Sequence, residues 1–325
     1  MTIRDWRMAQ TPFAVLDIET TGANAGLDRI VEISVIRLNP QSAKPEVAFD
    51  TLLNPRCPVT LTEVHGISQS DITDAPTFDA VAALLVAAIS DAVIVAHNAY
   101  FDIRFLRAEL GRVGVDFEAP YLCTMLLRPL LGMGSAVSLE QQCKQHGIQI
   151  GDGPHVASVD ATATAFMMLR YMREFQTKGI ATFSDLAARG APTKYPFLAS
   201  FAAAPLNATA VSGLPVPTTT KSRADKPTVE HFGTGAHVAV RREDYLSAVM
   251  NALSDFHLSD HELSYLTQLR EQQNLTDGQV RAAHARVYTY LLTAVSQDGV
   301  IDEQERAGLC CLVGLLRQLG WAPGD

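Results

Sequence analysis

Hydrophobic and polar positions follow two different periods along the first 180 residues. Three short apolar and β-branched runs, separated by Gly, Asn, Asp and Pro, predict successive strands at 13–20, 29–38 and 46–54. Further along, helical spacing alternates with two more strand-like runs. The remaining expected elements are helices at 77–89, 101–112, 138–146 and 158–174 and strands at 92–96 and 121–125. Strands joined first by hairpins and later through helices predict an α/β domain, with a mixed sheet flanked by helices.

The pattern changes twice in the second half of the chain. Residues 191–235 contain six prolines and a run of three threonines, a composition that predicts a tether without regular elements. Beyond it, apolar spacing predicts only helices, at 241–253, 261–272, 276–294 and 303–319. We therefore expect a first domain at 1–180, a linker at 181–236 and a small all-α domain at 237–325.

Composition narrows the class of protein. The chain has 325 residues, 47% of them hydrophobic, which is enough for a sizeable core. Its net charge of −9 speaks against a protein that coats nucleic acid through bulk charge, but not against an enzyme that holds a phosphodiester through metal ions. The five cysteines form no C-x-x-C pair, and the longest apolar run, at 80–89, is too short to span a membrane. We expect a cytoplasmic protein without a membrane partner.

Two acidic residues occupy the end of the first predicted strand. Asp17 and Glu19 are two positions apart, so both carboxylates lie on one face with Cα atoms about 6.5 Å apart. Such a pair repels unless a cation lies between the two groups. The alternatives are exposed acids at a strand end, or burial beside a basic partner, for which Arg29 is the nearest candidate in sequence.

Three further residues lie near two helix starts. Asp102 follows the strand-to-helix turn, where a carboxylate can also act simply as a helix cap. Asp160 falls in the first turn of the last helix of this domain, for which Ser158 is the expected N-cap. His155 lies on the loop before that helix.

Together these residue types suit phosphodiester hydrolysis. Four carboxylates can hold two Mg²⁺ or Mn²⁺ ions about 3.5–4 Å apart, because hard cations prefer oxygen ligands. A neutral histidine on a loop is suited to accept a proton from the attacking water near neutral pH. The residue pattern therefore predicts a two-metal hydrolytic site.

Several motifs occur together in one order. They are VLDIETTG at 15–22, VHGIS at 64–68, APTF at 75–78, VAHNAYFDIRFL at 95–106, LCT at 122–124 and HVASVDATATA at 155–165. With them, residues 11–176 resemble the DEDDh family of 3′–5′ exonucleases, especially the proofreading (epsilon) subunits of bacterial DNA polymerase III. The spacing between His155 and Asp160 is that of the histidine subclass. The resemblance implies a ribonuclease H-like fold.

The same resemblance implies roles for individual residues. Asp17 would bridge both metal ions, Glu19 and Asp160 would bind the ion that activates water, and Asp102 would reach the other ion. His155 would be the general base. Substrate-contacting positions are implied at Ile18, Thr20, Thr21, Gly22, His65, Asn98 and Phe101. For the residues outside the metal site, the alternative is a role in turns and packing.

The leading hypothesis is a metal-dependent 3′–5′ exonuclease that releases 5′-monophosphate nucleotides from single-stranded or frayed DNA 3′ ends in replication or repair. RNA trimming is the alternative within the same class, and a non-catalytic binding module is the alternative outside it. The C-terminal helices, with VSQDGVIDEQE at 295–305, resemble TerB-like helical domains. We expect this helical region to dock to a protein partner or to the substrate.

Overall fold

The computed structural model describes residues 2–42, 44–148, 155–207, 220–222, 245, 249, 260–295 and 303–323. The chain divides into two compact units, one formed mainly by residues 1–241 and the other mainly by residues 242–325. Each unit has its own hydrophobic core. The candidate site lies in the first unit.

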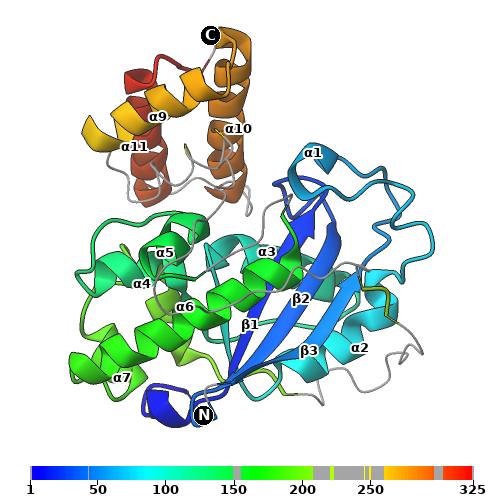
Figure 1. Cartoon of the computed structure of the whole chain (residues 1–325), viewed down its shortest axis with the longest axis vertical. Coiled ribbons are helices and arrows are strands. Elements are labelled where there is room, and N and C mark those ends of the chain that lie inside the picture. The colour runs from blue at the N-terminus through cyan, green and yellow to red at the C-terminus, as the bar shows by residue number, and fades with distance from the viewer. Residues whose placement is uncertain are drawn as a thin grey trace. The chain divides into compact units, whose positions relative to one another are not determined.

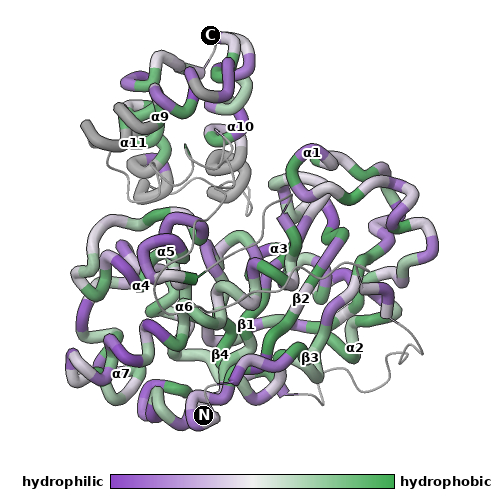
Figure 2. Tube along the Cα trace, viewed as in Figure 1, coloured by the Kyte–Doolittle hydropathy of each residue, from purple (hydrophilic) through white to green (hydrophobic). Residues whose placement is uncertain are grey.

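A five-stranded mixed sheet forms the centre of the first unit (Figure 1). The strands are β1 (Phe13–Thr20), β2 (Ile30–Asn39), β3 (Lys44–Leu52), β4 (Val93–Ala96) and β5 (Tyr121–Cys123). Their spatial order is β3-β2-β1-β4-β5. Strand β2 pairs antiparallel with both β1 and β3, and β4 pairs parallel with both β1 and β5. The central strands are mainly hydrophobic in Figure 2 and buried, because helices cover the sheet.

Two helices show how the sheet is covered. In Figure 1, α6 (Ala157–Thr177) crosses in front of the strands and α2 (Phe78–Ile89) lies behind them. Three alanines of α6, at positions 161, 163 and 165, are fully buried. Small side chains at these positions allow the helix to approach β1 and β2 closely. The carboxylates of β1 and the first turn of α6 therefore come within reach of each other.

The expected elements of residues 1–180 are all present, with bounds shifted by a few residues. The mixed sheet flanked by helices is confirmed, and the fold is ribonuclease H-like. The strand expected to end at 125 instead ends at Cys123, where α4 begins; Pro129 near the end of this helix hides its helical pattern. The other helices of the first unit are η1 (Met8–Gln10), α1 (Thr62–His65), α3 (Ala99–Arg112), α4 (Thr124–Leu130), α5 (Leu139–Gln145), α7 (Phe183–Ala187) and η2 (Pro196–Ala202).

Part of the segment expected to be a tether is folded onto the first unit. A capping box between Thr182 and Asp185 starts α7, and the ring of Phe183 packs edge-on against Phe201 of η2 at 5.1 Å. The Ser200 hydroxyl accepts a hydrogen bond of 3.0 Å from the backbone N–H of β5. The expectation of no regular element at 191–235 is wrong for η2, where the buried aromatic residues Phe197 and Phe201 anchor the chain between the prolines. The domain limits themselves stay a prediction.

The regular elements that the structure describes in the second unit are all helices. It contains α9 (Asp260–Gln272), α10 (Asp277–Val295) and α11 (Glu303–Gln318), which confirm three of the four expected helices. Of the fourth, expected at 241–253, the structure describes only Tyr245 and Val249, both helical, and the centre of the motif at 295–305 lies outside the described residues. The resemblance to TerB-like domains stays a prediction. Within the described parts of both units, no helix is long and apolar enough to cross a membrane.

Candidate active site

The structure brings together all four predicted carboxylates from three separate elements. Asp17, partly exposed, and Glu19, 9% exposed, lie on one face at the end of β1. Asp102 lies in the first turn of α3 and Asp160 in the first turn of α6, where they are 3% and 4% exposed. The charges of the other three acids all act on Asp17. The side chains therefore converge although their positions span more than 140 residues of sequence.

The electrostatics of this cluster are unfavourable to a set of ionised acids. Burial raises the pKa of Asp17 well above its ordinary value, and the negative charges of Asp160, Asp102 and Glu19 raise it further. Glu32 adds a smaller contribution in the same direction. A carboxylate in this environment is stabilised by a cation, so the arrangement favours a site for positive charge.

Asp102 is tied to the central strand as well as to its own helix. Burial raises the pKa of Asp102 well above its ordinary value, and the charge of Glu19 adds to that effect. Hydrogen bonds from the backbone N–H groups of Asp102 itself and of Ile18 oppose it. The bond from Ile18 shows that this predicted substrate position lies beside the acids, with its backbone in contact with one of them.

His155 is directly connected to the acid cluster. Its Nδ1 atom lies 2.9 Å from Oδ2 of Asp160, and the histidine side chain is 44% exposed whereas that of Asp160 is 6% exposed. One potential ligand atom from each of Glu19, His155 and Asp160 lies within 4.8 Å of the other two. Carboxylate oxygens together with an imidazole nitrogen can hold a divalent cation.

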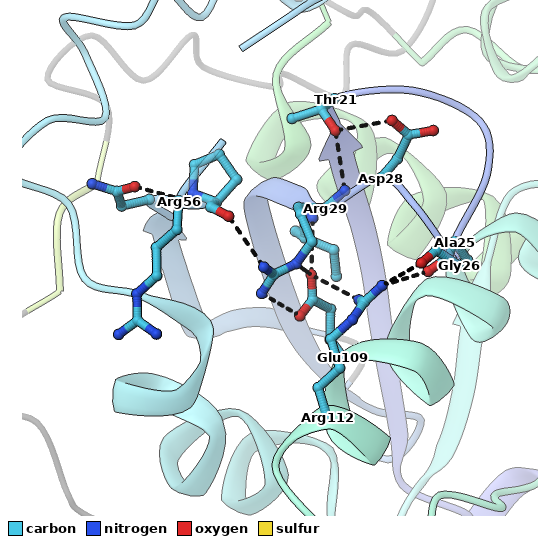
Figure 3. Close-up of polar contacts among 11 residues, drawn as sticks. Thr21, Ala25, Gly26, Asp28, Arg29, Arg56, Glu109 and Arg112 are labelled. Carbon is cyan, nitrogen blue, oxygen red and sulfur yellow. Dashed lines mark hydrogen bonds and ion pairs between the residues drawn. The ribbon is translucent and has the colours of Figure 1, made fainter. Parts of the chain in front are cut away.

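Arg29 does not neutralise the acids of β1. Its Nε and Nη2 atoms donate to the two carboxylate oxygens of Glu109, at 2.7 and 2.9 Å, as Figure 3 shows. Arg112 also lies 3.4 Å from this carboxylate, whose side chain is 1% exposed. The nearest basic residue in sequence therefore belongs to a separate ion-pair network on α3, and the alternative that it pairs with the acids of β1 does not hold.

The match to known proteins covers this unit. The exonuclease family (RNase_T) matches residues 14–168, a segment that contains all four acids and His155. Residues 14–168 form an exonuclease domain. A DNA polymerase III subunit epsilon-like protein from Rhodobacter capsulatus is 37% identical over 187 residues, which cover 54% of this chain and 26% of that protein.

Two further similarities concern the same domain. A PolC-type DNA polymerase III from Thermotoga maritima is 32% identical over 188 residues, covering 56% of this chain and 13% of the relative. A solved structure of exonuclease X in complex with 5′ overhanging duplex DNA has a TM-score of 0.40 and 22% identity, covering 55% of this chain and 99% of its own. The chain thus spans about a quarter or less of the length of these two curated relatives. The similarity identifies the domain, whereas the activity of the whole chain is a proposal.

The loop that follows β1 in the exonuclease domain is held by its own polar groups. The carboxylate of Asp28 accepts hydrogen bonds from the Thr21 hydroxyl at 3.2 Å and from the Asn24 backbone N–H at 2.8 Å. A Cβ atom on Gly22 would lie 2.4 Å from the Asp28 carboxylate, so a side chain at this position would displace that carboxylate. Thr20 donates its hydroxyl hydrogen to the Gly22 carbonyl at 2.6 Å. These three predicted substrate positions thus belong to one ordered turn beside the acids.

The same loop is fastened to α3 and to the residue before β2. Arg112 donates to the carbonyl oxygens of Ala25 and Gly26 at 2.9 and 3.1 Å (Figure 3). The backbone N–H of Thr21 donates to the Arg29 carbonyl at 2.9 Å. Contacts with α3 and β2 therefore position the turn that follows the two acids of β1.

His65 has a clear structural role within its own loop. It is 1% exposed; its Nδ1 accepts the backbone N–H of Ile67 at 3.0 Å, so its Nε2 is the donor to the Thr60 carbonyl at 2.9 Å. The neighbouring carbonyl of Val64 accepts the backbone N–H of His155 at 3.1 Å. The bond at Val64 therefore ties the segment around His65 to His155. A contact of His65 with the terminal bases stays a prediction.

The remaining predicted positions lie at the start of α3. Asn98 is the N-cap residue, with a left-handed backbone at φ 59°, and the helix begins at Ala99. Asp102 is thus inside the first turn of the helix and is not its N-cap residue. The ring of Phe101 packs on Phe105 with centroids 4.9 Å apart. Contact of Asn98 and Phe101 with a nucleotide stays a prediction.

Glu32 is a residue of the site that the sequence analysis missed. It lies on β2 directly opposite Glu19, is 2% exposed, and accepts the backbone N–H of Ala157 at 3.0 Å. The sequence signal that could have identified Glu32 is an acidic residue within the apolar run at 29–38. The expected N-cap at Ser158 is wrong: Val156 is the N-cap and has no polar side chain, and an acid from another element accepts the first helical N–H instead.

Proposed function

We propose that the chain is a two-metal-ion 3′–5′ exonuclease that releases 5′-monophosphate nucleotides from DNA 3′ ends in replication or repair. The observation that carries this proposal is the convergence of Asp17, Glu19, Asp102 and Asp160 from three elements, with His155 bonded to one of them. Such a cluster is costly to bury without cations, and it is the arrangement that two-metal phosphodiester hydrolysis requires.

The donor set fits divalent Mg²⁺ or Mn²⁺. The carboxylates supply hard oxygen ligands, and the raised pKa of Asp17 reflects burial and repulsion that a divalent cation would relieve. When bound, two such ions supply the positive charge that activates water and stabilises the leaving oxygen. Asp17, which interacts with each of the other three acids, would help to hold both ions.

His155 is suited to accept the proton of the attacking water. An ionised Asp160 can only accept, so Nδ1 of His155 carries the proton of their 2.9 Å hydrogen bond and Nε2 keeps its lone pair. The exposed side chain can meet a substrate and a water molecule from solvent. Asp160 thereby orients the base and also stabilises the imidazolium that forms when Nε2 is protonated.

The relatives support DNA as the substrate, and the charge of the chain supports binding at a strand end. The relatives of the exonuclease domain include DNA polymerase III proteins of the epsilon-like and PolC types. The net charge of −9 favours a domain that grips a strand end at a localised site over one that binds long nucleic acid through bulk charge. Ile18, Thr20, Thr21, Gly22, His65, Asn98 and Phe101 would contact the 3′-terminal nucleotide.

A strand-degradation assay tests the proposal. The full chain is incubated with single-stranded DNA and with RNA of the same sequence, labelled at either end, in Mg²⁺ or Mn²⁺ and in EDTA. We expect metal-dependent release of 5′-mononucleotides from the 3′ end of DNA, a shortening ladder from the 5′-labelled strand, and no release by Asp17→Ala. Faster degradation of RNA would contradict the substrate, and no degradation of either strand would contradict the activity.

A further inference from the structure

Glu32 places a fifth acid in a site whose proposed chemistry uses four. Glu32 and Glu19 are paired residues of the antiparallel β2 and β1, so their side chains lie on the same face of the sheet. Its charge acts unfavourably on Asp17. A buried acid that adds to this repulsion calls for a specific function, and the hydrogen bond that Glu32 accepts from Ala157 points to one.

The contact that Glu32 makes is with the beginning of α6. Its Oε2 accepts the N–H of Ala157, the first residue of that helix, at 3.0 Å. The first N–H groups of a helix have no partner within the helix, and its N-terminus carries partial positive charge. Val156 at the N-cap provides no side-chain bond. Glu32 thus does from β2 what a local capping residue usually does.

The turn that Glu32 holds is the one that carries two site residues. Asp160 is the fourth residue of α6, and His155 lies two positions before the helix. The opposite side of the same segment is held by the bond from the His155 N–H to the Val64 carbonyl. The 21-residue helix is otherwise anchored by side chains buried along its length. Loss of the Glu32 bond would therefore displace the first turn more than the rest of the helix.

We propose that Glu32 is a positioning residue, which holds the first turn of α6 so that Asp160 and His155 face the acids of β1. The inference rests on the proposed function and adds to it. The side chain acts through the backbone of Ala157, so its effect on the site is geometric. Supporting groups of this kind affect both metal affinity and turnover, because they orient the ligands.

Glu32→Ala and Glu32→Gln test this role in the full chain. Glutamine keeps an oxygen that can accept the N–H of Ala157, whereas alanine does not. We expect Glu32→Ala to weaken Mn²⁺ binding, measured by calorimetry without nucleic acid, and to lower kcat, each by about 10- to 100-fold, with little change in KM. Glu32→Gln should stay within about threefold of wild type, since the capping bond is retained.

A matched control separates positioning from general stability. Thr182→Ala removes the cap of α7, so it should lower the melting temperature without changing Mn²⁺ affinity or kcat. A second-site rescue tests the route directly: Val156 has the extended backbone of an N-cap, at φ −132° and ψ 115°, so Val156→Ser adds a local cap. We expect Glu32→Ala/Val156→Ser to fold and to regain most of the lost Mn²⁺ affinity and turnover.

The outcomes distinguish this inference from the proposed function. A wild-type chain that binds Mn²⁺ but degrades no strand would refute the exonuclease activity. The Mn²⁺ affinities of wild type and the Glu32 variants would still test the positioning role. Wild-type affinity and turnover in a folded Glu32→Ala protein would overturn the positioning role. So would a rescue variant as impaired as Glu32→Ala, or a loss in Glu32→Gln as large as that in Glu32→Ala.

Discussion

Asp17 is the residue at which stability and the proposed activity conflict most clearly. Burial and three neighbouring acids raise its pKa in the folded chain, so protonation of this group favours the folded state. Its contribution to stability is therefore present at low pH and is lost as pH rises through the raised pKa. At neutral and alkaline pH, the metal-free protein keeps a charge that its neighbours repel.

Asp17→Asn should therefore stabilise the metal-free protein while it removes activity. In EDTA at pH 8 we expect a higher melting temperature than wild type, by roughly 2–4 °C for each kcal/mol of relieved repulsion. Mn²⁺ should raise the melting temperature of wild type and have a much smaller effect on the variant. Thermal unfolding with and without Mn²⁺ measures both shifts. A variant that melts below wild type in EDTA would count against the repulsion.

His155→Gln tests the base at the same scale. Removal of the imidazole that is bonded to Asp160 should lower kcat by about 10²–10⁴ and leave KM for an oligonucleotide nearly unchanged. Steady-state kinetics in Mn²⁺ on a single-stranded substrate separates the two constants. Unchanged turnover would mean that another group accepts the proton.

At the scale of elements, local pattern and long-range contact were not equally predictable. Strand β1 has its expected bounds, because its run of apolar residues ends at turn-forming ones. The start of α6 differs from the expected one, because its first N–H donates to Glu32, which is 125 positions away in sequence. The partner of Arg29 was also unpredictable, since Glu109 is 80 positions away. Periodicity reports which face of an element is apolar, but not which distant polar group meets its end.

Glu109→Gln should show how much this network stabilises the exonuclease domain. The substitution weakens a nearly buried carboxylate that binds two arginines, so we expect a loss of about 2–3 kcal/mol in the free energy of unfolding. The control is Asp79→Asn. Asp79 forms an ion pair with Arg56, and the two side chains are 50% and 65% exposed, so this substitution should lower the free energy of unfolding by less than about 1 kcal/mol. Urea unfolding measures both variants. Equal losses would show that burial of Glu109 does not strengthen its ion pairs.

Gly22→Ala tests the turn after β1. The added Cβ would meet the Asp28 carboxylate at 2.4 Å, so that side chain must leave the loop and its bonds to Thr21 and Asn24 must break. We expect a loss of about 1–3 kcal/mol in stability and weaker binding of the oligonucleotide. Asp28→Ala removes the obstacle, so adding Gly22→Ala to it should cost less than Gly22→Ala costs alone. Additive losses would contradict the steric explanation.

The whole molecule contains two units with separate cores, and sequence composition predicted this division better than its details. The change from mixed to purely helical spacing indicated a second, helical part, which α9 to α11 bear out. Prolines suggested that the chain between the parts is a tether, but residues 183–187 and 196–202 pack on the first unit. Proline content does not predict which aromatic residues are buried in a hydrophobic core.

The helical unit should lose stability in mild acid because of His284. This side chain is fully buried, with Nε2 3.1 Å from the Tyr245 hydroxyl; burial, and after it the charge of Arg270, lowers its pKa to about 4. The unfolded chain has the ordinary value of about 6.5, so stability present above that pH is lost as pH falls towards 4. Urea midpoints followed by Trp321 fluorescence, in a Trp6→Phe background, should fall over this range.

His284→Leu is the matched comparison for this titration. Leucine cannot bind a proton, so the midpoint of the variant should depend much less on pH between about 6.5 and 4, whatever its absolute stability. The same slope in both proteins would show that other groups govern the acid sensitivity of the unit.

The central claim is that four acids from β1, α3 and α6 share a pair of divalent ions. Anomalous diffraction from crystals of the full chain soaked in Mn²⁺ tests it most directly. We predict two manganese peaks about 3.5–4 Å apart, with oxygen ligands from Asp17, Glu19, Asp102 and Asp160. Crystals without manganese between these side chains, or with a lysine or arginine group in that place, would contradict the account.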